Sequence, residues 1–130
     1  MSEAATPVDE TAEEFIQRWA ELNRDMQNIG ASPEYERITR GCEPCQGAIE
    51  RIAEIHAAGG FVEWDGMEIT RIKKMYTRSY DVWATSAPTR YKNSESSPVE
   101  RFKGGPHKFM LTLRRTADGF VVDDLARRPL

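Results

Sequence analysis

The spacing of hydrophobic residues divides the chain into a helical first half and a strand-rich second half. Apolar residues recur at intervals of four and three along the first predicted helix, which places on one side Phe15, Trp19, Leu22, Met26 and Ile29. Thr11 and Glu14 have the spacing of a capping box, so this helix is expected to begin after Thr11. Gly30 is expected to end it.

Two more helices are predicted before Gly60. Ser32-Pro33-Glu34 is typical of a helix start, and the short helix that follows would bury Tyr35 and Ile38 before Gly41. A second long helix is expected from about Pro44 to Ala58, ended by Gly59-Gly60. Its apolar side would consist of Ala48, Ile49, Ile52, Ala53 and Ile55.

After Gly60 the hydrophobic period changes to that of strands. Strands are expected over 61–64, 67–78 with a bulge near Arg71 and Ile72, 80–84, 109–113 and 120–125. Tyr80, Val82 and Ala84 would share one face, with Trp83 on the other. Residues 88–106 are polar and are predicted to form a long mobile connection.

Helices followed by strands predict an α+β fold, with the helices packed on a curled antiparallel sheet. At 130 residues the chain has the length of one domain. We expect this domain over 12–130, and we interpret the acidic and polar residues 1–11 as a disordered lead-in or tether.

The composition argues against two classes of protein, those that bind nucleic acid and those that span a membrane. The net charge is −3, without the clustered basic excess of nucleic-acid-binding proteins, so no nucleic acid is expected as a partner. Arg71, Lys73, Lys74 and Arg78 form a local basic run, interpreted as a solvated strand face. The sequence contains neither a membrane-spanning apolar segment nor the pattern of a signal peptide.

Cys42 and Cys45 are the only cysteines, and they lie three positions apart at a predicted helix start. A thioredoxin-like site would need an apolar strand before them, whereas residues 35–40 are polar and helical in pattern. A zinc site would need four ligands, and His56 and His107 are the only other soft candidates. A disulfide is therefore the leading interpretation, which requires an oxidising compartment. Free thiols, redox chemistry and metal binding stay open as alternatives.

Two segments resemble known families. The final hairpin, residues 109–115 and 118–125, resembles the closing strands of nuclear transport factor 2-like (cystatin-type cone) domains, with an Asp-Gly turn and an aromatic-x-Val-Asp pattern. Residues 41–60, with both cysteines and Gly59-Gly60, are similar to an actinobacterial family of secreted lipoproteins. The first resemblance implies a cone fold, and the second implies anchoring outside the membrane without an established activity. Pairing of two copies through their sheets is also common in domains of this fold.

The cone fold often opens a pocket between helices and sheet. Its candidate lining residues in this chain are Trp19, Tyr35, Tyr80, Trp83, Phe109 and Leu111. Enzymes of this fold use an Asp or His inside the cone as a general base, for which the chain offers Asp81 and His56. We expect Asp81 to point away from the core, His56 to lie near a helix end, and one of Asp123 and Asp124 to face solvent. No catalytic residue, metal ligand or cofactor is assigned.

The polar segment 88–106 carries a second set of candidates. Aromatic residues interleaved with cations could contact an anionic partner such as a cell-envelope polymer; these are Arg90, Tyr91, Lys92, Arg101 and Phe102, followed by Lys103.

These observations predict a non-enzymatic, extracytoplasmic binding domain, part of a cell-envelope lipoprotein whose lipid-attachment segment is not in this sequence. Its partner would be a protein, an envelope component or a small apolar ligand, and a homodimer is open. The alternatives are an isomerase or cyclase that uses the cone pocket, a thiol-disulfide oxidoreductase that uses Cys42 and Cys45, and a cytoplasmic location.

Overall fold

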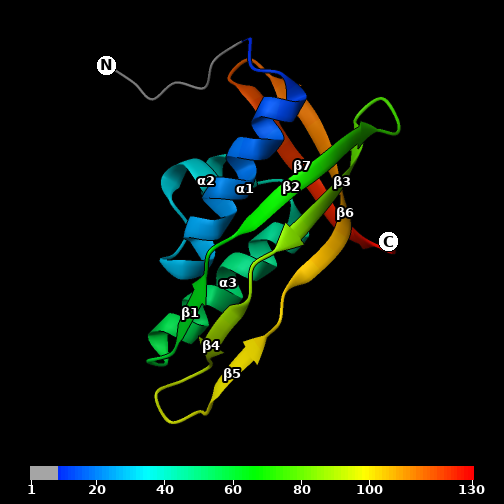
Figure 1. Ribbon diagram of the computed structural model, residues 1–130. Helices are drawn as coiled ribbons and strands as arrows, with labels where there is room; N and C mark the ends of the chain where they lie inside the picture. The colour runs from blue at the N-terminus through cyan, green and yellow to red at the C-terminus, as the bar shows by residue number, and fades with distance from the viewer. Residues whose placement is uncertain (1–8) are drawn as a thin grey trace.

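The computed structural model describes residues 9–130, in which three helices precede seven strands (Figure 1). The helices are α1 (Ala12–Asn28), α2 (Pro33–Ile38) and α3 (Glu43–Ala57). The strands are β1 (Phe61–Trp64), β2 (Met67–Lys74), β3 (Ser79–Ser86), β4 (Thr89–Lys92), β5 (Val99–Phe102), β6 (Gly105–Thr116) and β7 (Gly119–Arg128). This architecture confirms the predicted α+β class.

The start of α1 has the predicted capping box. The Glu14 backbone N–H donates to Thr11 Oγ1 at 3.1 Å, and the Thr11 N–H donates to Glu14 Oε1 at 2.9 Å. The predicted apolar stripe is correct at Phe15, Trp19 and Met26, which are buried. It is wrong at its end, because α1 stops at Asn28 and leaves Ile29 78% exposed.

Helix α2 buries Tyr35 and Ile38 as predicted, and α3 presents Ile52 to the core. Three more apolar residues of α3 pack at the edge of the core: Ala48, Ile49 and Ile55. Ala53 is exposed, so its predicted place on the apolar face of α3 is wrong. The helices lie along one side of the strands (Figure 1).

The larger sheet is antiparallel and has the strand order β2-β3-β6-β7. Its register shifts between Ile69 and Arg71, which confirms the bulge predicted near Arg71 and Ile72. Strand β2 ends at Lys74 rather than Arg78, because residues 75–78 form the turn to β3. Tyr80, Val82 and Ala84 face the core from β3, as predicted.

A second antiparallel sheet has the order β1-β4-β5. Its strands β4 and β5 fall within residues 88–106, so the predicted long connection is wrong. Strand β3 leads into β4 and β5 leads into β6, so this hairpin prolongs the β3–β6 pair past a bend (Figure 1). The sequence conceals β5 because all four of its residues are exposed, which removes the alternation that marks a strand.

Two glycines lie at points where two backbone segments are in close contact. A Cβ at Gly60 would overlap the Lys92 carbonyl oxygen, where the end of α3 meets β4. Gly104 has a φ of +78°, and a Cβ there would overlap the Ser86 carbonyl oxygen at the bend between the sheets. Side chains at either position would force the strands apart.

An ion-pair network fastens the chain before α1 to the helices. Arg18 contacts Glu10 at 2.9 Å and Glu34 at 2.6 Å, while the Arg115 guanidinium donates to the Glu10 carbonyl oxygen at 3.3 Å. Glu10 is only 8% exposed, so this part of the predicted lead-in packs against the helices, while the predicted domain boundary at residue 12 stays a prediction. Residues 1–8 of the predicted lead-in lie outside the described residues.

Candidate binding surface

Cys42 and Cys45 form a disulfide, which confirms the leading interpretation of the pair. Cys42 is the N-cap of α3, and its Sγ accepts a hydrogen bond from the Cys45 N–H at 3.2 Å. Relative exposures of 0% and 1% place both residues inside the core. A thiolate from a substrate protein could not reach either sulfur without local unfolding, so this geometry is that of a structural disulfide.

The structure places five of the six predicted pocket residues within one packed core: Trp19, Tyr35, Tyr80, Phe109 and Leu111. The Trp19 and Phe109 ring centroids lie 5.6 Å apart. The Tyr35 hydroxyl donates to Asn23 Oδ1 at 3.1 Å, and burial raises the pKa of Tyr35 to about 12. Their role as pocket residues stays a prediction.

Trp83, the sixth candidate, lies on the opposite face of the sheet with Asp81. Asp81 points away from the helices as predicted, yet it is only 2% exposed because neighbouring side chains cover it. Lys108 Nζ lies 3.5 Å from Asp81 Oδ2, and Arg128 Nε lies 4.0 Å from Oδ1. Oδ1 is without a hydrogen-bond donor in the described residues.

Cations from three strands surround these two residues. Strand β2 places Lys73 opposite Asp81 and Arg71 opposite Trp83, while β6 places Lys108 on the other side of Trp83. The Arg71 Cζ lies 4.7 Å from the Trp83 ring centroid, and Lys108 Nζ lies 4.6 Å from it. We define the cationic face as the set of Arg71, Lys73, Asp81, Trp83, Lys108 and Arg128.

The cationic face carries four formal positive charges and one negative charge, so its formal charge is +3. Arg71, Lys73 and Arg128 are exposed, whereas the Asp81 carboxylate is buried. Water and any partner therefore meet cations and an indole ring before they meet the carboxylate. Such a surface suits an anionic partner with flat or apolar groups.

Sequence reasoning identified Trp83 and Asp81 separately but missed their surroundings. The basic run in 71–78 was visible, but Lys108 and Arg128 are distant in sequence and join it only through the registers of β3–β6 and β6–β7. The Asp118-Gly119 turn was only a partial signal, because the register set by this turn would pair Lys108 with Arg127. A shift between Thr112 and Leu113, which the sequence did not reveal, pairs Lys108 with Arg128.

The other predicted contact residues lie on the β4–β5 hairpin. Tyr91 and Phe102 stack with centroids 5.2 Å apart, and Phe102 is 60% exposed. Arg90 already pairs with Glu63 at 2.6 Å and lies over the Phe61 ring at 4.9 Å. Lys92 and Arg101 also lie on this hairpin. The hairpin brings the predicted residues together, but Arg90 already pairs with Glu63 and is therefore less available to an anionic partner molecule.

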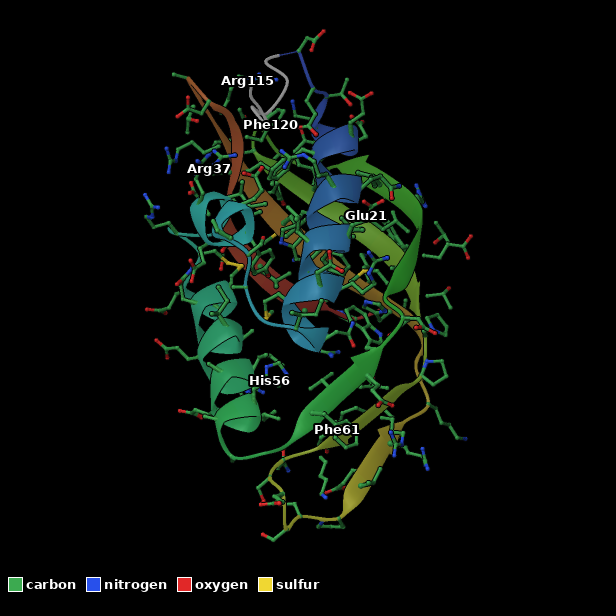
Figure 2. All side chains as sticks on the ribbon, turned by 90° about the vertical axis from the view of Figure 1, so that its left-hand side faces the viewer. Glu21, Arg37, His56, Phe61, Arg115 and Phe120 are labelled. Atoms are coloured by element: carbon green, nitrogen blue, oxygen red, sulfur yellow. A yellow bond between two sulfur atoms is a disulfide. The ribbon has the colours of Figure 1, made fainter. Side chains whose placement is uncertain are left out.

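The remaining titratable candidates are dispersed. His56 lies in the last turn of α3, as predicted, at the opposite end of the molecule from Arg115 and Phe120 (Figure 2). Asp123 pairs with Arg78 at 3.0 Å and Arg114 at 3.1 Å. Asp124 is exposed, which confirms that one of the two aspartates faces solvent.

Residues 9–130 contain no cluster of three acidic, histidine or cysteine side chains with the geometry of a metal site. None of the helices in that range has the length and apolar composition needed to span a membrane. An open groove of about 710 Å³ runs along the first half of α1 between Glu10, Glu14 and Arg18, outside the space between helices and sheet.

Comparisons with known proteins bear on the fold. Neither protein-family models nor curated protein sequences give a match. Among solved structures, the chain is similar to the crystal structure of the intermembrane space region of chloroplast protein ARC6, with a TM-score of 0.58 and 12% sequence identity. The alignment covers 96% of this chain and 100% of the other. At this identity the likeness concerns the α+β fold alone.

Proposed function

We propose that this chain is a non-enzymatic, extracytoplasmic binding domain with a nuclear transport factor 2-like cone, and that its cationic face binds an anionic component of the cell envelope. The observation that carries the proposal is the convergence of three cations, Arg71, Lys108 and Arg128, on Trp83 and the buried Asp81, on the sheet face that the helices leave uncovered. Strand β2 adds a fourth cation, Lys73, opposite Asp81.

The extracytoplasmic location is supported by the disulfide and, more weakly, by the intermembrane space origin of the similar structure. The resemblance of residues 41–60 to secreted lipoproteins extends the proposal to a lipid-anchored protein of the envelope. A cytoplasmic location would favour reduced cysteines, so the oxidation state of protein from its native host distinguishes the two.

The geometry gives less support to the two enzymatic alternatives. An isomerase or cyclase needs an acid or base that faces a cavity inside the cone, whereas Asp81 lies on the outer face and His56 lies at a helix end. An oxidoreductase needs an accessible sulfur, and Cys42 and Cys45 are both buried.

Self-association through the cationic face is disfavoured, because a two-fold axis through this face would bring its own cations together. This charge argument favours a different, anionic partner for the face. A homodimer through another surface stays a prediction, which sedimentation at increasing protein concentration would test.

The proposal can be tested by titrating the protein with inorganic polyphosphate and with neutral dextran. We expect salt-sensitive binding of polyphosphate only. The variant Arg71→Gln/Arg128→Gln should weaken binding about tenfold or more, because each removed cation contributes on the order of 1 kcal/mol of attraction near an anionic surface. This variant retains Lys108, which neutralises the buried Asp81.

The matched control is Lys92→Gln/Arg101→Gln, which removes the same charge from the β4–β5 hairpin. It should bind polyphosphate almost as well as the wild type. If the control loses affinity and the face variant does not, the hairpin is the contact surface and the assignment of the face is wrong. If the wild type does not bind polyphosphate, the proposal that this domain binds an anionic polymer is wrong.

A further inference from the structure

The β2–β3 turn is a second exposed feature, distinct from the residues around Trp83. We define the tip as residues 73–76, which are Lys73, Lys74, Met75 and Tyr76. Tyr76 is 72% exposed and Met75 is 38% exposed, whereas most large apolar side chains in the described chain are at least partly buried. Two adjacent apolar side chains therefore protrude into water next to two lysines.

The turn is held in a defined shape. The backbone N–H groups of Met75 and Tyr76 both donate to the Ser79 carbonyl oxygen, at 2.9 and 3.3 Å. The Leu113 N–H donates to the Arg78 carbonyl oxygen at 2.8 Å, and Arg78 pairs with Asp123 at 3.0 Å. These bonds fasten the turn to β6 and β7, so ordering its backbone on binding costs little additional entropy.

The charge within the segment that forms the tip is of one sign. Between Glu68 and Asp81 the sequence has four basic residues and no acidic residue, and Asp81 itself is buried. Arg78 shares the Asp123 carboxylate with Arg114, whereas Lys73 and Lys74 are exposed. A protruding Tyr-Met pair beside two exposed lysines matches a lipid surface, where Tyr occupies the interface and Lys contacts anionic headgroups.

We infer that the β2–β3 tip docks on an anionic lipid bilayer, with Met75 and Tyr76 entering the interfacial region and Lys73 and Lys74 contacting lipid phosphates. The apolar pair alone, or the two lysines alone, would bind a bilayer weakly. Together they add apolar insertion to electrostatic attraction, which makes binding to the bilayer stronger. The start of α1 lies at the same end of the molecule as the tip (Figure 1).

This inference uses a different surface from the proposed polymer site, apart from Lys73, which belongs to both. The two can therefore fail separately. The apolar residues Met75 and Tyr76 are needed only for lipid insertion, and Arg71 and Arg128 belong only to the cationic face. Variants confined to these pairs separate the two surfaces.

The test is co-sedimentation of the full chain with phosphatidylcholine vesicles that contain phosphatidylglycerol, and with pure phosphatidylcholine vesicles. We expect the wild type to bind the anionic vesicles and to lose most of this binding at high salt. Met75→Ser/Tyr76→Ser should reduce binding about tenfold or more, and Lys74→Gln should reduce it roughly fivefold.

The chain offers a closely matched control in Val99→Ser/Phe102→Ser. These residues are 41% and 60% exposed, similar to Met75 and Tyr76, but they lie on β5 at the other end of the molecule (Figure 1). The control should bind vesicles as the wild type does. All altered side chains are at least partly exposed, and a thermal melt of each variant checks that it folds.

Insertion has its own readout in Tyr76→Trp. Anionic vesicles should shift the emission of this indole to the blue, relative to the wild type with its three tryptophans, and lipids brominated near the headgroup should quench it. Unchanged vesicle binding by Met75→Ser/Tyr76→Ser would overturn the inference. Equal binding to neutral and anionic vesicles would also overturn it. Binding of polyphosphate without binding of vesicles would overturn it as well, and would show that the basic residues contact a polymer.

Discussion

Lys108 Nζ lies 3.5 Å from Asp81 Oδ2 across the β3–β6 pair, and the two partners differ in access to water. Asp81 is 2% exposed, whereas the Lys108 side chain is 18% exposed and the nearby Arg128 side chain is 44% exposed. If the pair is broken, the lysine can turn toward solvent but the carboxylate cannot. The loss of each partner should therefore have a different cost.

We predict that Lys108→Met destabilises the fold more than Asp81→Asn. The first change leaves the buried carboxylate with Arg128, at 4.0 Å, as its remaining ion-pair partner among the described residues, and removing one partner of a buried pair costs about 3–5 kcal/mol. The second change removes the buried charge, and its cost should be about 1–2 kcal/mol. Urea denaturation of both variants measures the two free energies of unfolding, and the reverse order would contradict this account of the face.

The sequence was sufficient for the helices and for most strands of the larger sheet, because these elements carry strong local signals. Thr11 and Glu14 cap α1, Gly59-Gly60 follows α3, and Phe109 and Leu111 alternate toward the core. The β4–β5 hairpin lacked such a signal, because it is stabilised by pairing with β1 and by continuity with β3 and β6 rather than by a buried face.

The candidate surface was less predictable than the fold. Alternation gave the direction of Asp81, but its burial depends on Lys108 and Arg128, which reach it across strand registers that the sequence only partly determines. In the same way, Tyr35 was visible as a buried aromatic residue, but its bond to Asn23 requires the crossing of α1 and α2.

The disulfide should resist reduction as long as the domain is folded. Because Cys42 and Cys45 are buried, dithiothreitol must wait for local or global opening before it reaches either sulfur. We expect slow reduction in native buffer and rapid reduction in urea, followed by alkylation and mass spectrometry. Rapid reduction of folded protein would contradict the structural role and revive the oxidoreductase alternative.

Removing the disulfide should lower stability without changing polyphosphate or vesicle binding. Because the closed loop is short, the expected loss is about 2 kcal/mol, at the low end of the usual range. The suitable variant is Cys42→Ser/Cys45→Ala, since a serine at the N-cap of α3 can still accept the hydrogen bond from residue 45. Thermal denaturation with the wild type as control measures the loss.

Glu34 should make the fold sensitive to acid. Partial burial alone would raise its pKa, but hydrogen bonds from Arg37 and Arg18 outweigh this effect and lower the pKa below its usual value. A lowered pKa in the folded state means that Glu34 contributes stability above the pKa it has when unfolded, and that this contribution is lost as pH falls through the folded pKa.

Glu34→Gln should therefore be less stable than the wild type at neutral pH, by about 1 kcal/mol or less, and this difference should shrink below about pH 4. The matched control is Glu36→Gln, an exposed residue of the same helix, which should change stability little at any pH. Chemical denaturation across this range measures both. A difference that stays constant down to low pH would show that Glu34 is not stabilised as an anion.

Tyr35 should have the opposite pH dependence, at the alkaline end. Burial raises its pKa to about 12 from a reference value of 10.0, so the unfolded chain releases the phenolic proton first. The neutral hydroxyl contributes fully below about pH 10, and this contribution is lost as pH rises through the folded pKa, by up to roughly 2–3 kcal/mol.

Tyr35→Phe should consequently cross the wild type in stability. Near about pH 8 the variant should be less stable by about 1 kcal/mol, because it lacks the hydrogen bond that the Tyr35 hydroxyl donates to Asn23. Above about pH 11 it should be the more stable of the two, because a phenylalanine has no proton for the unfolded state to release. Tyr76→Phe, at an exposed position, is the control that should follow the wild type throughout. Parallel stability curves for Tyr35→Phe and the wild type would show that the Tyr35 hydroxyl ionises as it does in water, which would contradict its burial between α1 and α2.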